Sequence, residues 1–267
     1  MGITTKYSVN LAHDITANIL LVAGGGSGAM AGQYNPAGGG GGGEVLLKEG
    51  VSMKSGVYKF FVGKGGSKGT TSIPSGQNTD GVDTKIEKKN SIIYRTKGGG
   101  RGGSVRHPSQ PGAYWEYQPG NGGSAGGTGR MLAALAISTK YNVDGYGHDA
   151  VDRSGAGAGG SGSMTPSGDN TGANGGPGIA VDISSQNVIY GAGGGAGGRY
   201  GPGSVGMGGN NETGHGAGTR GRQTPCLIKA VGCMSLCKYW SRNQSRRRWG
   251  IWSYNYQETA SILDIVN

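Results

Sequence analysis

Short apolar runs alternate with glycine-rich stretches along most of the chain. The runs are rich in Val, Ile, Leu and Tyr and are bounded by Gly, Asn, Ser or Pro, a pattern typical of β-strands. It predicts strands at residues 17–23, 44–53, 57–63, 91–96, 178–183 and 187–190. One Ala- and Leu-rich stretch, "GRMLAALAISTKYN" at residues 129–142, predicts a short helix that would need packing to persist.

Glycine fills the intervals between the runs, at residues 98–103, 120–129, 155–162, 191–209 and 214–221. Its spacing is partly three-residue, as in Gly191, Gly194 and Gly197, but the phase slips, which excludes a collagen helix. Extended, polyproline-II-like segments also have three residues per turn, and they lack internal hydrogen bonds. Their amides and carbonyls must therefore pair with neighbouring segments, and glycine allows those backbones to approach closely.

Composition supports order built on glycine. Glycine contributes 61 of 267 residues, about three times its usual share, while hydrophobic residues reach only 34%. A disordered glycine-rich chain is the alternative, but such chains lack the β-branched runs that recur here. In "PAGGGGGGEVLLKEG", residues 36–50, six glycines lead directly into a strand, so we interpret the glycine as scaffold. We expect a mainly β fold in which short strands and extended glycine-rich segments pack into a compact body with at most one short helix.

Two stretches carry a family resemblance. "ILLVAGGGSGAMAGQYNPAGGGGGGEVLLKEG", followed by "YKFFVGKGGS", resembles the glycine-rich domain of tail fibres and other appendages of tailed bacteriophages. "GGPGIAVDISSQNVIYGAGGGAGG", residues 175–198, resembles the later half of that domain. The resemblance covers about residues 15–220. It implies a non-enzymatic virion protein, often one whose surface loops meet the host.

The resemblance also sets expectations about partners. It implies location in the virion, contacts with other virion proteins, and a receptor that is a host surface glycan or outer-membrane protein. A homo-oligomer is expected, and many fibre proteins are trimers. Residues 1–14 would attach to the particle, and loops 107–120 and 141–153 would face outward. Capsid decoration or a head fibre is the alternative within the virion. A secreted glycine-rich structural protein is another alternative, although neither a secretion signal nor a flat threonine array is visible.

Catalytic patterns are weak. Gly193, Gly195 and Gly198 satisfy G-x-G-x-x-G but have no βαβ context. The turn "VDGYGHDAVD" carries Asp144, His148, Asp149 and Asp152, which do not match a calcium loop and are expected to be solvated. We therefore predict no enzymatic activity, no cofactor, no metal and no small-molecule substrate.

Aromatic residues crowd one loop, "HPSQPGAYWEYQPGNGG" at residues 107–123. Tyr114, Trp115 and Tyr117 are candidates for receptor contact, since exposed aromatics on a stiff loop anchor sugars and protein surfaces. Alternatively, they plug one side of a core that is short of large side chains.

The last segment, residues 221–267, has a different character. From residue 220 onward the chain has 8 of its 25 basic residues but only 2 of its 15 acidic ones, with 3 of its 61 glycines. Arg246, Arg247, Arg248 and Trp249 combine charge with a stacking group and are candidates for contact with an acidic surface, although we do not expect nucleic acid as the partner. This tail is either a docking extension or a frameshifted ending. If the codons of "KAVGCMSLC", residues 229–237, are read one nucleotide earlier, they permit Gly-Gly-Arg-Val-Tyr-Val-Ile-Val.

Overall fold

The computed structural model describes residues 5–29, 37–67, 78–106, 115–129, 135–163, 172–183, 188–197, 226–231 and 262–265. The described residues form strands and extended segments, and none of them lies in a helix. The strands are β1 (Thr5–Leu11), β2 (Ile15–Val22), β3 (Val45–Met53), β4 (Gly56–Val62), β5 (Thr84–Lys88), β6 (Ser91–Thr96), β7 (Ser104–Arg106), β8 (Trp115–Tyr117), β9 (Ile179–Val181), β10 (Val188–Tyr190), β11 (Cys226–Val231) and β12 (Ile262–Ile265).

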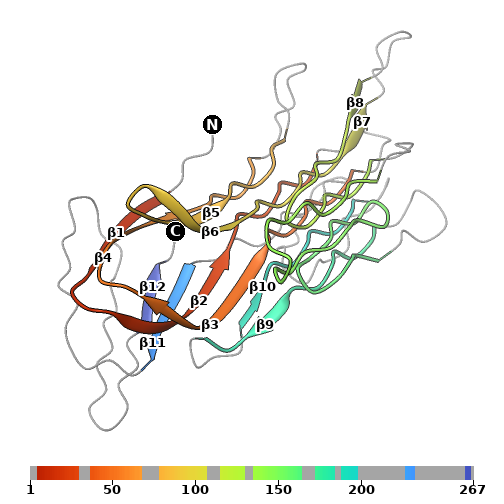
Figure 1. Cartoon of the computed structure of the whole chain (residues 1–267). Coiled ribbons are helices and arrows are strands. Elements are labelled where there is room, and N and C mark those ends of the chain that lie inside the picture. The colour runs from red at the N-terminus through yellow and green to blue at the C-terminus, as the bar shows by residue number, and fades with distance from the viewer. Residues whose placement is uncertain are drawn as a thin grey trace, which may run out of the picture.

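The strands pair antiparallel in four sheets. The first sheet has the order β1-β4-β5-β6 and the second has the order β12-β11-β2-β3. Two hairpins, β9–β10 and β7–β8, complete the set. Apart from β7–β8, the strands gather at one end of an elongated molecule (Figure 1). All six strands predicted from apolar runs are present, so the mainly β prediction is confirmed.

The second sheet lies between two other layers because β2 is apolar on both faces. Ile19 and Leu21 pack in one cluster with Phe60 of the first sheet. Leu20 and Val22 belong to a second cluster that includes residues of the β9–β10 hairpin. These β2 side chains are fully buried, and burying each one stabilises the fold by about 1.5–3 kcal/mol. The strand end of the molecule therefore has a conventional core of side chains, which we call the strand base.

Strands continue into glycine-rich segments that run side by side to the opposite end (Figure 1). β2 continues as residues 23–29, and residues 37–44 lead into β3. Amides of Ala23, Gly26 and Ala29 donate to the carbonyls of Glu44, Gly41 and Gly38. One hydrogen bond every third residue is what a polyproline-II-like segment with three residues per turn requires. We call this array of extended segments the glycine bundle.

The helix expected at residues 129–142 is wrong over the described part, residues 135–142. Ser138 forms an isolated β-bridge with Gly122, and the Thr139 amide donates to Gly122 O at 2.7 Å. Ala136 is buried, and its carbonyl accepts from the Ala150 amide. Bonds to distant backbone thus override the helix propensity of this Ala- and Leu-rich segment.

Candidate functional site

The run of six glycines is the centre of the glycine bundle. We call residues 37–44 the central segment; all of them are buried. Successive carbonyls of the central segment accept backbone hydrogen bonds from three neighbouring segments in turn. Segment 23–29 donates to the carbonyls of residues 38, 41 and 44. Segment 122–129 donates to those of residues 39 and 42, and segment 191–197 donates to those of residues 37 and 40. The amides of the central segment donate to two further neighbours, segments 97–103 and 153–158, at 2.8–2.9 Å. Five segments from across the chain thus surround it.

This position explains why six consecutive glycines occur. A Cβ on Gly38 or Gly41 would lie 2.1–2.2 Å from a carbonyl oxygen of segment 122–129. A Cβ on Gly39 or Gly42 would meet segment 191–197 at 2.0–2.1 Å, and one on Gly40 or Gly43 would meet segment 23–29 at 2.1–2.2 Å. All three faces of the segment therefore exclude any side chain. The glycine is the packed core of the bundle, as the sequence predicted.

Segments at the edge of the bundle keep side chains on their outer face. In segment 97–103, Arg101 interrupts the glycines and pairs with Asp80, Nη1 to Oδ2 at 3.1 Å. Asp80 also accepts the Arg101 backbone amide at 2.8 Å. A charged residue is tolerated here because its side chain lies partly in solvent beside Asp80.

Glu44 fastens an outer loop to the junction between bundle and strand base. Its side chain is fully buried, and Oε2 accepts the amides of Lys97 and Tyr141 at 2.9 and 3.0 Å. Oε1 accepts the Asn142 amide and side-chain Nδ2 at 3.0 and 2.8 Å. Four donors thus satisfy one buried carboxylate, which holds residues 141–142 in place. Sequence reasoning missed this role, although a lone acid between six glycines and an apolar strand was a visible signal.

The loop held by Glu44 exposes several large side chains to solvent, while the outward orientation of residues 141–153 in a particle stays a prediction. Val143 is 97% exposed, and Tyr141, Tyr146 and Val151 are also exposed. The Tyr141 hydroxyl donates to Asp83 at 3.1 Å. Partial desolvation of the phenol and the charge of Asp83 together raise the pKa of Tyr141 above its ordinary value of 10.0.

The acidic turn of the same loop is tied to its neighbours. Asp144 pairs with Lys48, and this hydrogen bond lowers the pKa of the Asp144 carboxyl. Asp149 accepts the Ser138 amide at 2.6 Å. Among the described residues, no group of three or more His, Cys, Asp or Glu side chains is placed to hold a metal ion.

Two of the three predicted receptor-contact residues lie at the end of the bundle far from the strand base. Trp115 and Tyr117 belong to β8, which pairs with β7 in a hairpin at that end (Figure 1). Arg106 lies opposite Trp115, and Ser104 lies opposite Tyr117. Tyr114 lies outside the described residues, as do Arg246, Arg247, Arg248 and Trp249 of the predicted basic-tail contact. The structure therefore brings two of the three aromatic candidates to one projecting hairpin.

Backbone hydrogen bonds also join several pairs of described segments that are separated in sequence by short stretches. Ala29 pairs with Gly38 on either side of residues 30–36, and Ser67 pairs with Thr79 on either side of residues 68–77. Ser163 and Asn174 flank residues 164–171 in the same way.

The C-terminal region contributes backbone to the strand base. β11 pairs antiparallel with β2, with Leu227 opposite Leu20, and β12 pairs with β11. The divisions at residues 14 and 220, and the origin of residues 221–267, stay predictions. The described residues contain no helix long and apolar enough to span a membrane.

Comparison with known proteins gives one match. No curated protein and no solved structure matches the chain. The model of a family described as "Glycine-rich domain" matches residues 4–226, a range that takes in strands β1 to β10 and the whole described bundle. The chain therefore belongs to the glycine-rich domain family.

Proposed function

We propose that the protein is a non-enzymatic structural protein of a bacteriophage virion, a tail fibre or tip adhesin that contacts the host surface. The observation that carries this proposal is the β7–β8 hairpin with Trp115 and Tyr117, set at the far end of the glycine bundle. Aromatic residues on a rigid support lose little conformational entropy when they bind, which suits them as anchors for a receptor.

The bundle supports this role through its stiffness. Its segments are joined by regularly spaced backbone hydrogen bonds of 2.7–3.4 Å. Residues 38–43 of the central segment are all glycine, so this stretch has no side chains that could change rotamer. A stiff support holds the hairpin away from the strand base, which leaves the base for contacts with other virion proteins. Such a protein would act as a homo-oligomer, and its receptor would be a surface glycan or an outer-membrane protein.

Adsorption to bacterial cells tests the proposal. Purified full-length protein, labelled at a surface amine, would be incubated with candidate host cells and, in parallel, with isolated phage capsids. We expect binding to cells, and we expect Trp115→Ala to reduce it at least tenfold, as loss of a central aromatic anchor does. Tyr146→Ala is the matched control, because Tyr146 is an exposed aromatic on the loop near the strand base.

One outcome would contradict a receptor contact at the hairpin, and another would contradict the adhesin role itself. Equal loss of binding in both variants would show a general effect of aromatic residues rather than a contact at the hairpin. Binding to capsids alone would instead indicate capsid decoration or a head fibre.

A further inference from the structure

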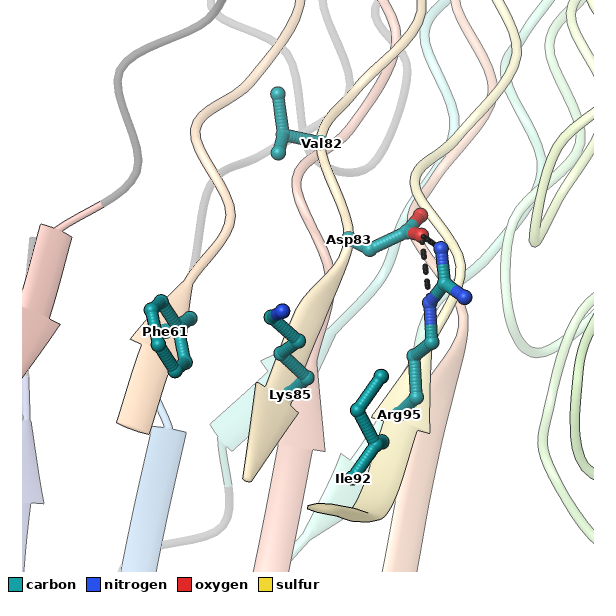
Figure 2. Close-up of a pocket in the computed structure, with 6 residues that line it drawn as sticks. All are labelled: Phe61, Val82, Asp83, Lys85, Ile92 and Arg95. Carbon is teal, nitrogen blue, oxygen red and sulfur yellow. Dashed lines mark hydrogen bonds and ion pairs between the residues drawn. The ribbon is translucent and has the colours of Figure 1, made fainter. Parts of the chain in front are cut away.

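An open pocket of about 390 Å³ lies on the outer face of the first sheet, far from the β7–β8 hairpin. Phe61 of β4, Val82 and Ile92 supply its apolar surface, and Lys85 and Arg95 supply cations (Figure 2). Its volume is in the range of small-ligand sites, which combine apolar walls with a few polar groups.

The polar groups of the pocket are preorganised. Arg95 donates from Nε and Nη2 to Asp83 Oδ2, at 2.9 and 2.6 Å, as the dashed lines show (Figure 2). Its guanidinium also stacks 4.4 Å from the ring centre of Tyr141, which Glu44 holds through the loop backbone. Among the described residues Arg95 Nη1 has no hydrogen-bond acceptor, so this fixed cation still presents donors.

The ammonium groups of two lysines lie near the Phe61 ring at the rim of the pocket. Lys85 Nζ lies 4.6 Å from the ring centre and Lys6 Nζ lies 5.6 Å from it. Lys85 pairs with Glu87 at 2.6 Å, whereas Lys6 has no carboxylate partner among the described residues. Two ammonium groups held near one ring repel each other unless an anion lies between them.

The rest of this face also has more positive than negative charge. Lys59 bonds only to the neutral Asn90 side chain, and Lys97 lies 5.4 Å from the Tyr141 ring without a carboxylate partner in the described chain. Asp83, which itself lines the pocket, and Glu87 beside it are each already paired with a cation. The surface therefore favours a ligand that brings negative charge.

The geometry points to a binding site for an acidic saccharide, a sugar carrying a carboxylate or phosphate group. The apolar ring faces of a sugar suit Phe61, Val82 and Ile92, and its anionic group suits Lys85, Lys6 and the free donors of Arg95. Charge-assisted hydrogen bonds of this kind are about twice as strong as neutral ones. This site lies on a different sheet from the hairpin and does not depend on the adhesin proposal.

Titration calorimetry on the full chain tests the site. The probes are trigalacturonic acid for carboxylate, mannose 6-phosphate for phosphate, neutral maltotriose, and a short single-stranded DNA. We expect one or both acidic sugars to bind and maltotriose not to bind. Added salt should weaken binding, because the cations are partly exposed.

Variants locate the binding on this face. Lys85→Gln should weaken binding of the acidic sugar about tenfold, since it removes one charge-assisted bond. Phe61→Ala should weaken it by removing the apolar surface, and Lys54→Gln should leave it unchanged. Lys54 is the matched control, because it is an exposed, ion-paired lysine at the β3–β4 turn. Melting curves verify that each variant is folded.

Several results would overturn the site. These are no binding of either acidic sugar, equal binding of maltotriose, or equal weakening by Lys85→Gln and Lys54→Gln. Tighter binding of the DNA than of both sugars would instead identify a nucleic-acid surface. Each result is independent of whether Trp115→Ala affects adsorption to cells.

Discussion

The strand base and the glycine bundle are continuous in the chain but are stabilised by opposite means. In the base, side chains such as Leu21 and Phe60 fill the space between sheets. In the bundle, the central segment has no side chain from Gly38 to Gly43, and neighbouring backbones meet directly. The base gains stability from burial of apolar area, which is non-directional. The bundle relies on hydrogen bonds, each contributing a net of about 0.5–1.5 kcal/mol.

The difference predicts opposite sensitivities to mutation. A side-chain core is damaged when atoms are removed, because a cavity is left. A core made of closely packed backbone has no side-chain atoms to remove, and it is damaged when atoms are added. The following substitutions test that contrast, from the largest expected effect to the smallest.

Gly42→Ala should destabilise the protein most, by about 5 kcal/mol or more, because the added methyl group would meet backbone atoms rather than side chains that can move aside. The added methyl carbon would lie 2.0 Å from Gly191 O and 2.7 Å from Gly191 C, both backbone atoms. Thermal unfolding followed by circular dichroism measures the effect. Gly160→Ala is the control, because its nearest contact would be a Pro177 side-chain carbon at 3.4 Å. Similar melting temperatures for both variants would contradict the close packing of the bundle.

Phe60→Ala should destabilise the base by about 3–5 kcal/mol, the usual range for loss of a buried Phe. Phe60 is 1% exposed and packs between the first and second sheets. Urea denaturation measures the change. Val57→Ala, on the same strand but 51% exposed, should have little effect. A small effect at Phe60 would mean that the base, too, depends mainly on its backbone.

Glu44→Gln tests the junction of the two regions, with an expected loss of about 1–3 kcal/mol. Each carboxylate oxygen of Glu44 accepts hydrogen bonds from two N–H groups. A glutamine would place its NH₂ group, which is also a donor, against two of these N–H groups in either orientation of the amide. Hydrogen exchange at the Tyr141 and Asn142 amides should accelerate. Asp144→Asn, an exposed change in the same loop, should leave this exchange slow. Unchanged exchange in Glu44→Gln would show that the loop is held without Glu44.

Asp14→Asn probes the exposed edge of the base and should have the smallest effect. The Ser55 amide and Lys54 hold the pKa of Asp14 below its usual 3.8. The unfolded chain therefore binds the proton more readily than the native protein does, and the stabilisation is present above pH 3.8. It is lost as the pH falls through the lower native pKa. The difference in melting temperature between wild type and Asp14→Asn should shrink over that interval, and a difference that grows instead would reverse the assignment.

Much of this architecture could be predicted from sequence because its signals are local. Apolar runs located β2, β3, β4, β6, β9 and β10, and glycine spacing indicated three-residue segments. β5 was missed because "TKIEK" contains one apolar residue, Ile86, which is fully buried. The helix prediction was wrong over residues 135–142 because Ala136, Ser138 and Thr139 are held by backbone partners elsewhere in the chain.

The candidate sites depended more on contacts between distant residues. An aromatic cluster marked the hairpin, since its residues are neighbours in sequence. The Glu44 contacts join residues 97 and 98 positions apart, and the pocket joins β4, β5 and β6. A single sequence carries no local signal for such pairings, because many glycine segments have the same composition.

The central segment also constrains the order in which the protein can fold. Residues 37 and 40 accept hydrogen bonds from Gly197 and Gly194, more than 150 positions later in the chain. During synthesis, the six glycines leave the ribosome long before the segment that closes their third face exists. Such long loop closures make folding slow, and the unfinished chain presents unpaired amides and carbonyls meanwhile. The bundle is therefore a structure that the chain completes only after most of its length has been made.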